Sequence, residues 1–263
     1  MPLADRFSMS GRRALVTGAS MSMGREIALA FAEAGADVAV HFASRIDEAL
    51  GLGSAAGEVA AEIERLGRRA VLVDADLGET GAGRRAVEAA IAGLGAVDVL
   101  VVCASVQRWE TFEEASEKAV ALQVQVDFLA TIELMQAALP GMKERHWGRV
   151  LTIGSINEKR PHEHLAVYAA LKSAQANLAM GLAKRYAAHG VTVNNIAPGL
   201  VHTVRNRFRR EDPDGWALIQ QGANPMHRAG RPEEIAPAAL LLCSEAGSFI
   251  TGANLDIGGG AHL

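Results

Sequence analysis

The strongest constraint on the fold is an alternation between short apolar runs and longer stretches of helical character. Seven runs rich in β-branched or apolar residues occur along the chain, at 14–18, 37–42, 70–76, 97–104, 149–155, 191–199 and 254–260. Continuous apolar runs of this kind, separated by amphipathic segments, indicate strands covered on both faces. The pattern predicts an α/β protein with a doubly wound sheet of about seven parallel strands and helices on both faces.

The length of 263 residues allows one large domain or two small ones. No linker rich in Pro, Gly or Ser divides the chain, so we predict a single domain over residues 1–263. The segment 47–57 has weak periodicity and three glycines, which predicts an extended loop before a helix at about 58–66. The segment at about 200–225 is predicted to be a substrate loop or lid.

Charge and cysteine content exclude several classes of protein. The net charge of −4 gives no electrostatic footprint for nucleic acid. Cys103 and Cys243 lie in apolar surroundings and are interpreted as buried thiols, with no disulfide framework and no metal-site spacing. No run approaches the roughly 18 apolar residues of a spanning helix, and no signal peptide is apparent. We therefore expect a cytoplasmic protein with no membrane and no metal.

A glycine turn follows the first predicted strand. It contains Gly18 and Gly24, and a helical stretch comes directly after it. Glycines let the backbone approach a pyrophosphate, and a helix N-terminus directs free N–H groups at that anion. The turn therefore predicts a Rossmann-type dinucleotide site, although a tight corner that binds nothing is an alternative.

The end of the second predicted strand bears on which dinucleotide is bound. A carboxylate about 20 residues after the glycines usually receives the 2′-hydroxyl of NAD. Here Phe42 is followed by Ala43, Ser44 and Arg45, and no carboxylate occurs before Asp47. A hydroxyl and a guanidinium match a 2′-phosphate better than a free diol. The expected cofactor is NADP, with NAD as the alternative, and the bland interpretation of Arg45 is a solvated loop charge.

Three residues form a candidate catalytic group. Tyr168 and Lys172 are four apart in a helical stretch and therefore share a face, in a chain with only two tyrosines. Ser155 ends the fifth predicted strand, at the sheet edge where α/β proteins bind ligands. A nearby ammonium favours the phenolate that acid–base chemistry requires. A surface Tyr–Lys pair spaced this way by chance is the alternative.

These residues resemble the short-chain dehydrogenase/reductase family over nearly the whole chain. TGASMSMG is similar to the family's glycine motif, Asp76 and Leu77 to its adenine-contacting pair, and the segment around Pro198 to the one beside the nicotinamide. The resemblance implies a single domain and commonly a homotetramer. The catalytic residues that it implies are Ser155, Tyr168, Lys172 and Asp127. The cofactor contacts that it implies are Gly18, Ser20, Met21, Met23, Gly24, Phe42, Ser44, Arg45, Asp76, Leu77, Ala104, Tyr168, Lys172, Pro198, Gly199, Val201 and Thr203.

The chain departs from the family pattern at three places. Ser22 occupies the position of the middle glycine, where a positive φ would cost free energy. The segment 102–105 reads Val-Cys-Ala-Ser in place of Asn-Asn-Ala-Gly, which predicts apolar packing instead of an amide network. Asp127 aligns with an asparagine thought to hold a relay water, and it adds a charge there.

The predicted function is an oxidoreductase that interconverts a hydroxyl and a carbonyl, with Tyr168 as general acid and base. The alternatives are a 3-oxoacyl-thioester reductase and a non-catalytic dinucleotide-binding protein. Residues placed at the pocket by the resemblance are mainly polar, which predicts a small sugar, polyol or sugar-acid substrate. They are Gln107, Trp109, Asn157, Glu158 and His202, with Arg108, His162 and His164 beside them, and the lid adds Arg205, Arg207, Arg209 and Arg210. The alternative is that these arginines lie on a solvent-exposed face of a helix, where Glu211, Asp212 and Asp214 balance their charge.

Overall fold

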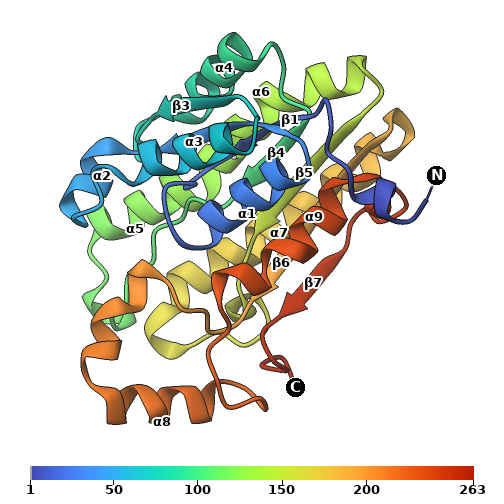
Figure 1. The fold of residues 1–263 in the computed structure, drawn as a ribbon. Coiled ribbons are helices and arrows are strands. Elements are labelled where there is room, and N and C mark those ends of the chain that lie inside the picture. The colour runs from blue at the N-terminus through green and yellow to red at the C-terminus, as the bar shows by residue number, and fades with distance from the viewer. Residues whose placement is uncertain (1) are drawn as a thin grey trace.

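All seven strands lie parallel in one sheet, in the order β3-β2-β1-β4-β5-β6-β7 (Figure 1). The computed structural model describes residues 2–263. Each strand coincides with one of the apolar runs, which confirms the predicted sheet. The strands are β1 Arg13–Val16, β2 Asp37–Phe42, β3 Ala70–Asp74, β4 Val99–Val102, β5 Gly148–Ile153, β6 Val191–Pro198 and β7 Asn254–Ile257.

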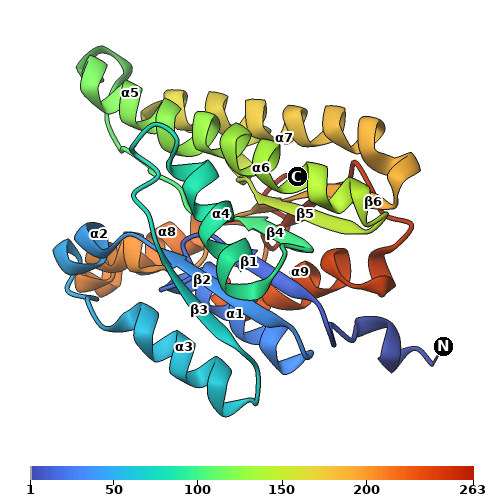
Figure 2. The same cartoon turned by 90° about the horizontal axis from the view of Figure 1, so that it is seen from above.

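Helices cover both faces of this sheet (Figure 2). The helices are α1 Ser22–Glu33, α2 Ser44–Ala49, α3 Ala55–Arg65, α4 Ala82–Leu94, α5 Glu117–Val124, α6 Ala130–Glu144, α7 Ala166–Tyr186, α8 Pro213–Ala223 and α9 Ala236–Cys243. One apolar core joins α1, α3 and α9 to the sheet, and a second joins α4, α6 and α7 to its other face. Strands β1, β4 and β5 are buried on both faces, which explains their continuous apolar sequences.

The predicted extended loop at 47–57 is wrong. Helix α2 covers Ser44–Ala49 and α3 begins at Ala55, so only five residues between them are non-helical. Ala56, Val59 and Ile63 form one buried stripe at helical spacing. Because burial of Ala56 stabilises the first turn, α3 begins before Gly57. The glycines therefore weakened the apparent periodicity without preventing the helix.

The strand order reverses direction at β1. The chain continues from β1 to β2 on one side, and β4 lies on the other side of β1. A doubly wound sheet binds ligands at this crevice, beyond the carboxyl ends of its strands. The glycine turn follows β1, the Val-Cys-Ala-Ser segment follows β4, and Ser155 follows β5. Among residues 2–263, no helix combines the length and apolar character needed to cross a bilayer.

Candidate active site

In the glycine turn after β1, backbone segments approach each other too closely for a side chain to fit between them. Gly18 has a φ of +64°, and a Cβ there would lie 3.1 Å from the Cα of Ala104. A Cβ at Gly24 would collide with the carbonyl oxygen of Gly18. Only glycine fits at these two positions, and the 12-residue helix α1 begins between them. The turn therefore leaves backbone N–H groups free to meet a diphosphate, and it fits the dinucleotide expected from the sequence.

Two buried side chains that the sequence analysis did not single out support this turn. The Nδ1 atom of His41 accepts a hydrogen bond from the Gly18 N–H at 3.2 Å, and burial lowers the pKa of His41 from 6.5 to about 4. The Thr17 hydroxyl accepts from the N–H groups of Cys103 at 2.9 Å and Ala104 at 3.1 Å. The one sequence signal for this support was His41, a histidine near the end of an apolar strand.

The segment after β4 packs as its sequence predicted. Cys103 packs against one apolar core and Ala104 against the other, while Thr17 holds their N–H groups. Burial raises the pKa of the Cys103 thiol to about 11. The Thr17 hydroxyl, directly after β1, thus satisfies two backbone N–H groups of this segment.

The segments that follow β2 and β3 carry both signs of charge. The N–H of Ser44 donates to Asp74 Oδ1 at 3.0 Å, and Arg45 forms an ion pair with Asp76 at 3.0 Å. The Arg45 side chain is 83% exposed. Its guanidinium is therefore accessible to a solvent anion.

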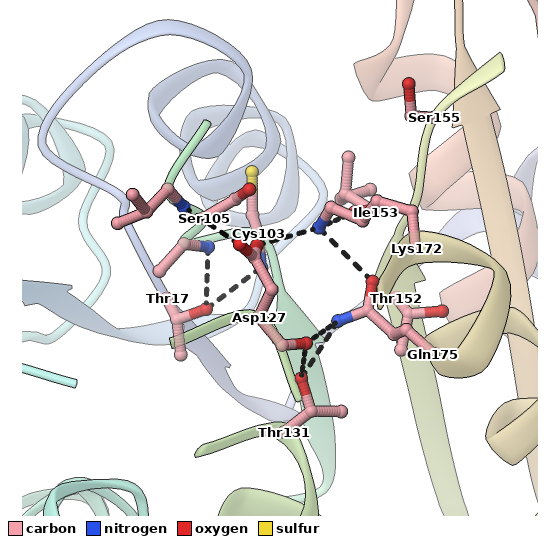
Figure 3. Close-up of polar contacts among 12 residues, drawn as sticks. Thr17, Cys103, Ser105, Asp127, Thr131, Thr152, Ile153, Ser155, Lys172 and Gln175 are labelled. Atoms are coloured by element: carbon pink, nitrogen blue, oxygen red, sulfur yellow. Dashed lines mark hydrogen bonds and ion pairs between the residues drawn. The ribbon is translucent and has the colours of Figure 1, made fainter. Parts of the chain in front are cut away.

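Lys172 is the most constrained of the three candidate catalytic residues (Figure 3). Its side chain is 1% exposed, and Nζ donates to the Ile153 carbonyl at 3.0 Å and to Gln175 Oε1 at 3.3 Å. The same Nζ lies 5.7 Å from the centroid of the Tyr168 ring, one helical turn away. Helix α7 therefore places an ammonium beside the buried phenol, as the four-residue spacing predicted.

Asp127 completes the surroundings of this ammonium. It lies in a π-helical turn at Gln125–Leu129, and its Oδ1 is 3.4 Å from Lys172 Nζ. Its Oδ2 accepts from the Val106 N–H at 3.4 Å, and Gln175 Nε2 donates to its backbone carbonyl at 3.3 Å. Asp127 and Lys172 thus form a fully buried ion pair. Gln175, three residues after the lysine, is a positioning residue that the sequence analysis did not identify.

Ser155 directly follows β5 with an extended backbone, and its Oγ is oriented by one neighbour. Asn157 donates to this Oγ twice, from its backbone N–H at 3.2 Å and from its side-chain Nδ2 at 3.1 Å. Both lone pairs of the hydroxyl are therefore used, and its hydrogen remains free to donate to a substrate oxygen.

The segment after β6 closes the crevice from the other side. Gly199 lies against Gly258, because a Cβ at Gly199 would be 2.8 Å from the Gly258 Cα. Val201 is buried, and the Thr203 N–H donates to Asn206 Oδ1 at 3.1 Å. The chain then enters a 3-10 helix, η7, at Val204–Glu211, and continues into α8. The predicted lid at about 200–225 is therefore mainly helical.

The lid arginines bind protein atoms. Arg205 donates to the Ser105 carbonyl at 2.9 Å, and Arg207 to the Leu50 carbonyl at 3.0 Å. Arg209 stacks over the ring of Trp109, with Cζ 4.4 Å from its centroid. Asp212 instead caps α8 by accepting from the Gly215 N–H at 3.1 Å. The lid thus spans the loops on both sides of the crevice.

Among the residues expected to line a substrate pocket, Glu158 differs from the others because its side chain turns into the protein. Trp109 is 48% exposed, Asn157 contacts Ser155, and His202 packs edge-to-face on Trp216 with centroids 5.3 Å apart. Gln107 is half-buried in the loop after β4. The Glu158 carboxylate turns inward, where it accepts from the N–H of Ser155 and from the side-chain amides of Asn195 and Asn254. Glu158 thus holds the backbone of Ser155, and its carboxylate is engaged within the protein, whereas its place in the sequence suggested a group directed at substrate.

The comparisons with known proteins agree with this geometry. A family model described as enoyl-(acyl carrier protein) reductase matches residues 18–262. The 7alpha-hydroxysteroid dehydrogenase of Escherichia coli (strain K12) is 32% identical over 98% of this chain and 96% of its own.

Two solved structures are also similar. A 3-oxoacyl (acyl-carrier-protein) reductase from Agrobacterium tumefaciens C58 with NADP bound is 42% identical, with a TM-score of 0.92 over 99% of this chain and 98% of its own. A gluconate 5-dehydrogenase from Burkholderia cenocepacia J2315, in complex with NADP and tartrate, is 28% identical, with a TM-score of 0.89 over 99% and 98%.

Proposed function

Because the chain belongs to the short-chain dehydrogenase/reductase family, whose members act on hydroxyl and carbonyl groups, we propose that it acts on a small polar substrate. The class is a sugar, a polyol or a sugar acid, and the cofactor is NADP. The observation that carries this proposal is the buried Lys172 ammonium beside Tyr168, at the sheet edge where Ser155 presents a free hydroxyl hydrogen.

Each side chain has one task in this reaction. When bound, NADP supplies or accepts the hydride. Lys172 favours the phenolate of Tyr168, which takes the proton of the alcohol or, in the reverse direction, returns it to the carbonyl oxygen. Ser155 donates a hydrogen bond to the same oxygen, because Asn157 occupies both of its lone pairs. Gly18 and Gly24 let the backbone approach the diphosphate, and the other cofactor contacts are proposed at the positions named from the sequence.

The preference for NADP rests on Ser44 and Arg45. A charge-assisted hydrogen bond to a phosphate contributes about 1.5 to 3 kcal/mol. Arg45 is exposed and paired only with Asp76, so a 2′-phosphate can replace that partner. Two NADP-bound neighbours support the same choice. Titration of NADPH and NADH against the wild-type protein and Arg45→Ala tests it. Tighter NADH binding to the wild type would contradict the preference.

A polar substrate is favoured by Asn157, which contacts Ser155, and by His162, whose backbone N–H donates to Asn157. A 3-oxoacyl thioester is the second candidate, because a neighbour at 42% identity carries that name. We also propose a homotetramer in the cytoplasm, where the free thiols of Cys103 and Cys243 stay reduced.

The test is a substrate screen with a matched dead variant. Sugars, polyols, sugar acids, cyclohexanone-like ketones and acetoacetyl thioesters are compared at equal concentration, and reduced nicotinamide is followed by absorbance. Tyr168→Phe should keep cofactor affinity within a few-fold while turnover falls roughly 10²-fold or more, the usual scale of a lost general acid. Near-normal turnover in this variant would reject the catalytic assignment. A clear preference for apolar ketones or thioesters would reject the polar substrate.

A further inference from the structure

Four side chains from three separate segments meet beside the catalytic serine, and we call them the Trp109 cluster. Trp109 lies in the loop after β4, His162 and His164 precede α7, and Arg209 comes from the lid helix η7. The Trp109 ring centroid is 4.4 Å from that of His162 and 5.4 Å from that of His164. The Arg209 Cζ lies 4.4 Å from the Trp109 ring. The lid thus meets the pocket loops through a cation on an aromatic ring.

Hydrogen bonds connect this cluster to the reacting end of the site. Asn157 donates from Nδ2 to Ser155 Oγ at 3.1 Å, and its Oδ1 accepts from the His162 N–H at 3.0 Å. One amide side chain therefore separates the catalytic hydroxyl from His162. A substrate held at Ser155 is therefore one amide side chain away from the segment that carries His162.

The hydrogen-bonding state of His162 makes it a donor. Its Nδ1 accepts from the His164 N–H at 3.2 Å, so the ring proton of the neutral form is on Nε2. His162 is exposed, and Nε2 donates whether the ring is neutral or protonated. The cluster therefore offers one N–H donor and one permanent cation, Arg209, whose guanidinium is half-buried against Trp109 and Phe208.

The acids beside the cluster do not cancel this charge. Glu163 is 85% exposed and reaches only to 3.9 Å from His164 Nε2. One carboxylate oxygen of Glu110 is buried in the protein without a hydrogen-bond partner. In the part of the chain that the structure describes, neither carboxylate forms an ion pair with Arg209.

We propose that the Trp109 cluster binds the carboxylate of a sugar acid, with Arg209 and His162 as donors and Trp109 as the ring that holds both of them in place. This inference rests on the proposed function and narrows its substrate class to polyhydroxylated carboxylic acids. Planar guanidinium groups pair with carboxylates through two parallel hydrogen bonds. Because Arg209 belongs to the lid, the same anion ties the lid to the pocket.

The experiment compares a sugar acid with the polyol of the same chain length, in the wild type, Arg209→Gln and Arg209→Lys. The wild type should have the higher kcat/KM for the acid. Arg209→Gln should raise KM for the acid at least about tenfold, the loss of one charge-assisted hydrogen bond. The KM for the polyol should stay within about twofold. Arg209→Lys should recover part of the loss, and His162→Phe should show a smaller selective increase.

Each outcome separates this inference from the proposed function. Equal KM increases for acid and polyol in Arg209→Gln would overturn the carboxylate site, as would a wild type that turns over polyols but not acids. Both results leave the polar-substrate function intact. Turnover of thioesters or apolar ketones alone would overturn the proposed function and the inference with it. Loss of folding in Arg209→Gln is excluded by an unchanged melting temperature, and His162→Phe tests the site from a second segment.

Discussion

Asp127 and Lys172 set the charge beside Tyr168. Their side chains are 0% and 1% exposed, and their atoms are 3.4 Å apart. A carboxylate at this distance partly cancels the ammonium, which otherwise favours the phenolate. An asparagine of the same shape would leave the ammonium unopposed.

Asp127→Asn should therefore move the midpoint of the pH–rate profile for alcohol oxidation toward lower pH. The measurement is kcat/KM between pH 5 and 10 in both proteins. Thermal melts accompany it, because a buried ion that loses its partner costs stability. A midpoint that stays in place or rises would show that Asp127 does not act on Tyr168 through charge.

His41 links protein stability to pH. Burial disfavours the charged ring and lowers the pKa of His41 from its ordinary value of 6.5 to about 4. Between these values the unfolded chain binds the proton and the folded one does not. Its contribution is thus fully present above about pH 6.5 and is lost as the pH falls toward 4. The lowered pKa of His41 corresponds to about 3 kcal/mol of the free energy of unfolding, which is lost when the pH falls below both pKa values.

Urea unfolding at pH 7, 5.5 and 4.5 measures this effect. His41→Gln offers an amide oxygen to the Gly18 N–H without a titrating ring. The variant should lose less free energy of unfolding than the wild type between pH 7 and 4.5. The same pH slope in both proteins would assign the acid sensitivity to other groups.

At the scale of elements, Ser22 joins the glycine turn to the lid. Its φ of +51° is in the left-handed region, and its Oγ accepts from the Val204 N–H at 3.1 Å. The departure from glycine that the sequence shows thus has a structural role: backbone strain is offset by a contact between residues 182 positions apart. No local pattern could have predicted this partner.

Two substitutions separate strain from contact at this position. Ser22→Ala keeps the strained backbone and loses the acceptor, so it should lower the free energy of unfolding by roughly 1 kcal/mol. Ser22→Gly loses the same acceptor but relieves the left-handed backbone, which is worth roughly 1 kcal/mol. The glycine variant should therefore be more stable than the alanine variant in urea unfolding. Equal stabilities would mean that the backbone of Ser22 is unstrained.

The sheet could be predicted because each strand carries its own apolar signal, whereas helix α2 and the start of α3 could not, because three glycines between 47 and 57 obscure their periodicity. The Tyr168–Lys172 spacing and Ser155 at a strand end likewise placed the candidate catalytic group. Orientation could not be predicted, since it depends on distant partners. Glu158 turns inward because Asn195 and Asn254 on neighbouring strands donate to it, and their distance in the sequence hides that arrangement.

The last strand gives the whole molecule an open edge. Within residues 2–263, β7 pairs only with β6, so its outer backbone groups have no strand partner. Leu255 on β7 is 38% exposed, and Phe249 in the loop before it is fully exposed. An edge with apolar side chains favours association with a second copy, and closed twofold symmetry leads to dimers and tetramers.

Light scattering of the purified protein should therefore give four chains per particle, as the resemblance to the family implies. The double variant Phe249→Ser/Leu255→Lys places a charge on the β7 edge and removes the exposed ring, so it should reduce the particle to two chains while leaving far-UV circular dichroism unchanged. Phe112→Ser is the matched control, because Phe112 is 69% exposed in a 3-10 turn at Phe112–Glu114, outside the sheet. A wild type of one chain would contradict the assembly, and a double variant of four chains would place the interface on another face.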